Sequence, residues 1–155
     1  MSLTLSYVEI QSLSGDSQRH LIESLVQKMF RRLSSLEQIP FVELSCSSQE
    51  EPLYAISLIC KESLGVQFFF YEIITKWLIP GRKILSPFFL HSSFKHSLDP
   101  SGVYCFCEIR FSLSDDQDFD DLYYHFQQLL PDLKQGVSSA YQAHKILEHR
   151  SFYSS

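Results

Sequence analysis

The longest run of hydrophobic positions in the chain is Val66–Trp77, which contains three consecutive phenylalanines and the only tryptophan. Aromatic and β-branched residues favour strands. Both alternating faces of the run are apolar in the middle, as in a strand that is covered on both sides. We predict a strand here and keep a buried helix as the alternative, because periodicity does not separate the two in a short apolar run.

Five further segments carry strand patterns. In the clearest of them, 103–113, apolar and polar positions alternate, and Cys105 and Cys107 fall on the apolar face. This alternation is typical of a half-buried antiparallel strand. The other predicted strands span 3–13, 41–46, 53–61 and 84–90. The last of these lies in 82–102, the least regular part of the chain, and a long loop without an element of its own is a functional hint.

Helical patterns follow the first strand and fill the C-terminal part. Over 17–35, apolar residues recur every three or four positions, as on the buried face of a core-packing helix. A second helix is predicted over 119–130 and a third over 132–149, with Pro131 ending the one or beginning the other. Gly136 weakens the third helix by about 1 kcal/mol relative to alanine.

Together these patterns predict a single α+β domain over residues 1–150 and a frayed tail over 151–155. The domain would be an antiparallel sheet of five or six strands, with one helix from the N-terminal half and two C-terminal helices packed on it. A length of 155 residues fits one domain. The content of 45% hydrophobic and 20% charged residues is that of a globular protein.

Net charge and the lack of targeting signals indicate which partners and which cellular location to expect. A net charge of −5 disfavours nucleic acid as a partner, because a phosphate backbone needs a basic surface. Residues 1–13 lack the pattern of a signal peptide. The longest apolar stretch is interrupted by polar residues and is too short for a membrane-spanning helix, which needs about 20 apolar residues. We therefore expect a soluble cytoplasmic protein with reduced thiols and no membrane partner, and the residue usage points to a bacterium.

Two patterns raise the question of a metal. His91, His96 and Asp99 lie in the irregular segment and have the residue types that hold mononuclear iron or zinc, without the spacing of an H-E-x-x-H helix. The pair Cys105-x-Cys107 lacks the paired C-x2-C knuckles of structural zinc, and on an apolar face cysteine behaves as a small hydrophobic residue. We expect no cofactor, and His91, His96 and Asp99 are the candidate ligands if a metal binds.

The sequence contains no G-x-S-x-G, P-loop or dinucleotide-binding motif. This absence, the acidic charge and a sheet edge available for a partner strand favour a non-enzymatic protein-interaction or adaptor module. We expect it to be homodimeric, chaperone-like and bound to another protein. In size, acidity and α+β composition the chain resembles the small secretion chaperones of bacteria. The predicted element order departs from theirs, because two consecutive helices end the chain and no helix interrupts the strands.

Two other functions stay open at this point. The first is a small metal-dependent enzyme of the non-haem iron or zinc type, or a degenerate, inactive relative of one, with ligands from the 82–102 segment. The second is a small-molecule-binding, β-rich domain with a pocket lined by Phe69, Tyr71 and Trp77, since aromatic side chains offer large apolar surfaces to a ligand.

Overall fold

The computed structural model describes residues 8–11, 16–47, 52–114 and 118–154. Along the chain the elements are β1 (Val8–Gln11), α1 (Asp16–Arg31), η1 (Leu36–Gln38), β2 (Phe41–Cys46), β3 (Tyr54–Lys61), α2 (Val66–Trp77), β4 (Leu85–His96), β5 (Asp99–Ser112), α3 (Phe119–Ser138) and α4 (Ala140–Ser154). The parts of the predicted first strand at 3–7 and 12–13 lie outside the described residues.

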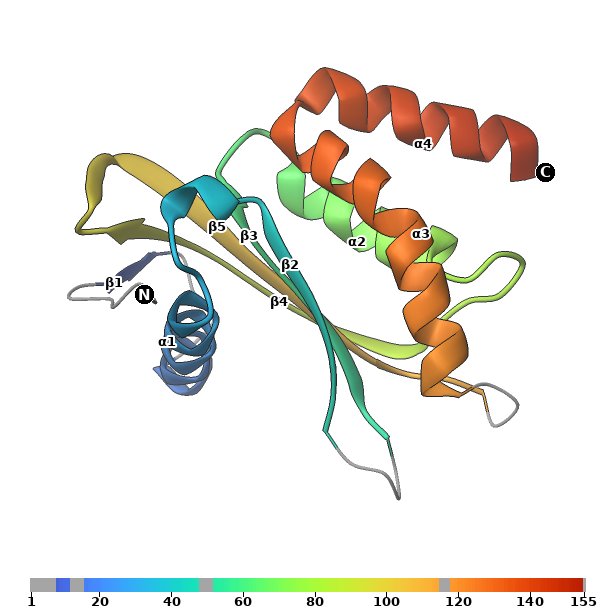
Figure 1. The fold of residues 1–155 in the computed structure, drawn as a ribbon, viewed down its shortest axis with the longest axis horizontal. Helices are drawn as coiled ribbons and strands as arrows, with labels where there is room; N and C mark the ends of the chain where they lie inside the picture. The colour runs from blue at the N-terminus through green and yellow to red at the C-terminus, as the bar shows by residue number, and fades with distance from the viewer. Residues whose placement is uncertain (1–7, 12–15, 48–51, 115–117, 155) are drawn as a thin grey trace.

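The strands form one antiparallel sheet with the order β1-β4-β5-β3-β2. Its body consists of the four strands β4, β5, β3 and β2, and the short β1 is added outside one end of β4, where it pairs with residues 93–96. Helices α2, α3 and α4 lie on one face of this sheet and α1 lies on the other face (Figure 1). The described chain is thus a sheet between one helix and a group of three.

The sheet separates two hydrophobic cores. The larger core lies beneath α2 and α3, and Cys105 and Cys107 of β5 belong to it. The smaller core lies beneath α1 and includes Tyr104 and Phe106 of the same strand. Successive side chains of a strand point to opposite faces, so the alternation predicted over 103–113 corresponds to β5. The middle of β5 is buried on both faces, since helices cover the sheet from both sides.

The predicted strand over Val66–Trp77 is wrong, because this segment forms helix α2. Its buried residues recur at helical spacings of three and four, namely Val66, Phe69, Phe70, Ile73 and Ile74. Phe68 and Tyr71 are exposed on the other side of the helix, and these outward hydrophobic residues hide the helical period in the sequence. Packing of one helical face against the sheet outweighs the strand propensity of the individual residues.

The irregular segment 82–102 is not mostly loop. It forms β4 and the beginning of β5, which are joined by a tight turn with His96 paired to Asp99. A bulge between Leu85 and Phe88 and a second register shift near the turn interrupt the alternation of side chains. The alternation of apolar and polar residues is therefore interrupted at these positions, although β4 and β5 remain paired on both sides of them.

The boundary between the C-terminal helices also differs from the predicted one. Helix α3 continues through Pro131, and α4 runs into the segment predicted as a frayed tail. Leu129, Leu133 and Val137 form one buried stripe across the proline, so packing offsets the roughly 3 kcal/mol that an interior proline costs. The described residues contain four α-helices. The α+β class is confirmed, and the arrangement of five or six strands with three helices is wrong.

Gly136 of α3 lies where α3 packs closely on α2. A Cβ atom added at Gly136 would clash with the ring of Phe69. We expect Gly136→Ala to lower the free energy of unfolding by about 1–3 kcal/mol through overpacking, although alanine is the better helix former by about 1 kcal/mol. Chemical denaturation measures the change. A second substitution, Phe69→Leu, should recover part of the loss, and a Gly136→Ala variant that is more stable than the wild type would contradict this packing.

Candidate functional site

One edge of the sheet is open along part of β4. The strand pairs with β5 on its inner side, and on its outer side β1 reaches only residues 93–96. Within the described part of the chain, residues 88–91 have no strand on their outer side. The outward N–H and C=O groups of such an edge lack ladder partners, which makes the edge a template for a strand from another chain.

Apolar side chains border this open edge. Phe88 is 48% exposed and Leu85 is 46% exposed. The ring of Tyr71 from α2 packs on that of Phe89, with 5.5 Å between the ring centroids, and remains partly exposed. No charged residue occurs over 85–92, although natural edge strands usually carry charges that prevent pairing. The bulge at Pro87, which has no N–H, ends the edge that can pair.

The opposite edge of the sheet, β2, is better protected. Glu43 in its centre accepts two hydrogen bonds from the Arg32 guanidinium, with both N···O distances at 2.5 Å. Val42 and Leu44 pack against the larger core. No large hydrophobic side chain of β2 is exposed. Among the described strands, β4 therefore offers the apolar, uncharged edge.

The structure separates His91 from the other two predicted metal ligands, His96 and Asp99, which are register partners at the turn between β4 and β5. Nδ1 of His96 accepts a hydrogen bond from the N–H of Leu98 at 3.0 Å, and the Asp99 carboxylate accepts one from the hydroxyl of Tyr104 at 2.7 Å. The His96 ring stacks on a phenylalanine of α1 on the side of the smaller core, and burial lowers the pKa of His96. His91 lies on the opposite face of the sheet. The three side chains therefore do not converge.

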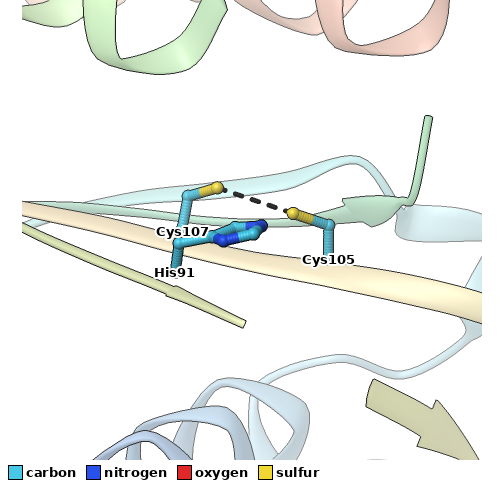
Figure 2. Close-up of side chains that lie close together, drawn as sticks. All are labelled: His91, Cys105 and Cys107. Carbon is cyan, nitrogen blue, oxygen red and sulfur yellow. Dashed lines mark hydrogen bonds between the residues drawn. The ribbon is translucent and has the colours of Figure 1, made fainter. Parts of the chain in front are cut away.

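His91 instead meets the two cysteines of β5. One ring nitrogen of His91 and the sulfurs of Cys105 and Cys107 all lie within 4.8 Å of one another. Figure 2 shows the imidazole beside the two sulfur atoms, which point toward each other and are 3.6 Å apart. Cys60 of β3 is the register partner of Cys105 on the other side. We call these four residues the Cys–His cluster. The sequence pattern shows only that Cys105 and Cys107 share a face.

The hydrogen bonds of the cluster make Cys105 its most acidic thiol. Bonds from Cys107 and then Cys60 lower the pKa of Cys105. The pKa of Cys60 is raised, chiefly because its thiol is hydrogen-bonded to Cys105, and burial raises the pKa of Cys107. The bond with Cys105 also raises the pKa of His91. These bonds favour a negative charge on the sulfur of Cys105, beside the imidazole of His91.

A buried carboxylate lies on the face of β5 that carries α1. Oε1 of Glu108 accepts a hydrogen bond from the Ser57 hydroxyl at 2.5 Å, and Oε2 accepts one from Nε of Arg110 at 2.8 Å. The Glu108 side chain is only 5% exposed, whereas that of Arg110 is 28% exposed. Both oxygens of the buried charge are thus paired, as burial of a carboxylate requires.

The aromatic residues proposed to line a ligand pocket lie on α2 and not on strands. A cavity of about 210 Å³ between α2 and α4 includes Phe69 in its wall, but neither Tyr71 nor Trp77. The side chain of Trp77 packs at the border of the larger core. This cavity therefore does not bring the three aromatic residues together.

Comparisons with known proteins add no relative. No family model, no curated protein and no solved structure matches this chain. In the described ranges, no helix has the length and apolar character needed to cross a membrane. The open edge of β4 and the Cys–His cluster are therefore the features of the molecule that bear on its function.

Proposed function

We propose that this protein is a non-enzymatic protein-interaction module that pairs with a second copy of itself through residues 88–91 of β4. The observation that carries the proposal is the open, uncharged edge bordered by exposed Leu85 and Phe88. Antiparallel pairing of two β4 strands would give the outward backbone groups of both copies their hydrogen-bond partners. Such a contact is self-complementary about a two-fold axis, because each copy offers the same residues.

The element order supports the chaperone-like part of the proposal in one respect. Helix α2 lies between β3 and β4, so a helix does interrupt the strands, and this difference from the small secretion chaperones of bacteria is removed. Two consecutive helices still end the described chain. A dimer built on β4 would leave the edge of β2 and the surface of α1 for another protein, which is the class of partner that we propose.

Phe88→Lys tests the edge. The substitution brings two like charges into one short interface, and like charges that face each other across an interface are unfavourable by several kcal/mol. We expect the wild-type protein to sediment as a dimer and Phe88→Lys to weaken the dimer by more than about 100-fold. Sedimentation velocity over a range of protein concentrations measures both.

Tyr124→Lys is the matched control, because Tyr124 is an exposed aromatic residue of α3, away from β4. It should sediment as the wild type does. The proposal is wrong if the wild type stays monomeric at every soluble concentration, or if the Phe88→Lys and Tyr124→Lys variants form the dimer equally well.

A further inference from the structure

We propose that the Cys–His cluster binds one zinc ion, with His91, Cys105 and Cys107 as ligands and Cys60 as the side chain that completes the coordination. The three ligand atoms come from the adjacent strands β4 and β5 and already lie within 4.8 Å of one another. Cysteine and histidine are the ligands of structural zinc sites, which are four-coordinate and tetrahedral. This inference does not depend on the dimer.

The distance between the two sulfurs fits a shared zinc ion. A Zn–S bond of about 2.3 Å in a tetrahedral site places two sulfur ligands about 3.8 Å apart. The sulfurs of Cys105 and Cys107 are 3.6 Å apart. Because the two residues are next-but-one neighbours on a strand with partners on both sides, their spacing is held by the ladder. Binding would therefore need little movement of these two ligands.

The charges of the cluster also suit a divalent cation. Zn²⁺ with three thiolates and one neutral imidazole carries a net charge of only −1, so the metal and its ligands largely compensate each other on burial. Binding would release one proton each from Cys60, Cys105 and Cys107. The carboxylate of Glu62 accepts a hydrogen bond from the hydroxyl of Ser93, which is the register partner of Cys105 on β4, and its negative charge favours a cation at this place.

The imidazole is the part of the cluster that core packing does not explain. Nε2 of His91 is buried and has no hydrogen-bond partner in the described chain, and a buried polar atom without a partner is unfavourable. The cysteines are explained by packing, because cysteine fills apolar space as a small hydrophobic residue beneath α2 and α3. A metal bond made by Nε2 would give this atom the partner that it lacks, and the ring lies beside the two sulfurs (Figure 2).

Cys60 is the proposed fourth ligand, and it also lines a cavity through which a metal ion could enter. It is the register partner of Cys105 across β3 and β5. Cys60 also lines a cavity of about 270 Å³ together with Glu62 and Lys61. A zinc ion entering along this cavity would join β3, β4 and β5 beneath the helices.

Titration of the untagged, reduced and chelator-free protein with Zn²⁺ against a chromophoric chelator tests the site. We expect one ion per chain with a dissociation constant of about 10⁻⁷ M or tighter at pH 7, the weak end of the range for structural zinc sites. Co²⁺ should produce the thiolate-to-cobalt charge-transfer band of a tetrahedral thiolate site. Binding weaker than about 10⁻⁵ M, or cobalt without that band, overturns the proposal.

Variants locate the ligands. Loss of an outer-shell partner weakens metal binding by about 10- to 100-fold. We expect a larger loss of zinc affinity from each of the ligand variants Cys105→Ala, Cys107→Ala and His91→Gln. The matched controls are Cys46→Ala, on β2, and His144→Gln, whose side chain is exposed on α4. Equal losses in the controls, or tight binding that survives Cys105→Ala, overturn the proposal. The wild-type cobalt spectrum decides the question even if a core variant fails to fold.

Discussion

Phe70→Ala is expected to lower the free energy of unfolding by about 3–5 kcal/mol, whereas Phe68→Ala on the same helix should change it by no more than about 0.5 kcal/mol. Phe70 is fully buried in the larger core, and Phe68 is 72% exposed. The loss at Phe70 combines the transfer of a large apolar side chain to water with the cavity that remains. Urea denaturation of both variants measures the difference.

This pair of substitutions also distinguishes a helix from a strand at Val66–Trp77. In a strand, Phe68 and Phe70 point to the same face, because side chains alternate with a period of two. In a helix of 3.6 residues per turn they point to nearly opposite sides. Similar losses at both positions would contradict the helix, and a large loss at Phe70 alone agrees with it.

Arg110→Met is expected to lower the free energy of unfolding by about 3 kcal/mol, because it leaves the buried Glu108 carboxylate without its charged partner. This is the low end of the range for broken buried pairs, since Arg110 is partly exposed and water screens the interaction. The Ser57 hydroxyl would still bond to the other carboxylate oxygen. Chemical denaturation near neutral pH measures the effect.

Arg150→Met is the matched control for Arg110→Met. Nη2 of Arg150 lies 2.7 Å from Oδ2 of Asp132, and the two arginine side chains have similar exposure, but the Asp132 side chain is 43% exposed. Its carboxylate can be solvated when the arginine is lost, so we expect a loss of about 1 kcal/mol or less. Adding Glu108→Gln to Arg110→Met should restore much of the stability. No restoration in this double variant would contradict the charge-burial explanation.

The sequence predicts the fold best where one face of an element is apolar. The helical period over 17–35 and the alternation over 103–113 correspond to α1 and β5. At Val66–Trp77 the prediction fails, because exposed Phe68 and Tyr71 make both faces of the segment hydrophobic. Over 82–102 it fails because bulges shift the register of β4. In both segments the local pattern lacks the information on which tertiary packing depends.

Local sequence patterns predict the candidate sites less well than they predict the helices and strands. His91 was a candidate ligand, but its neighbours Cys105 and Cys107 follow from the register of β4 and β5, which no local pattern encodes. The open edge depends on how far β1 extends along β4. Side-chain spacing within one strand is visible in a sequence, and contacts between strands are not.

Amide hydrogen exchange of β4, measured at several protein concentrations, is the sharpest test of pairing between two copies. We predict that the segment 88–91 exchanges slowly when the protein is concentrated and faster on dilution, because the outward amides of this segment gain strand partners in the dimer. The Phe88→Lys variant should exchange rapidly at every concentration. Exchange of 88–91 that is independent of concentration in the wild-type protein would contradict the proposed dimer edge.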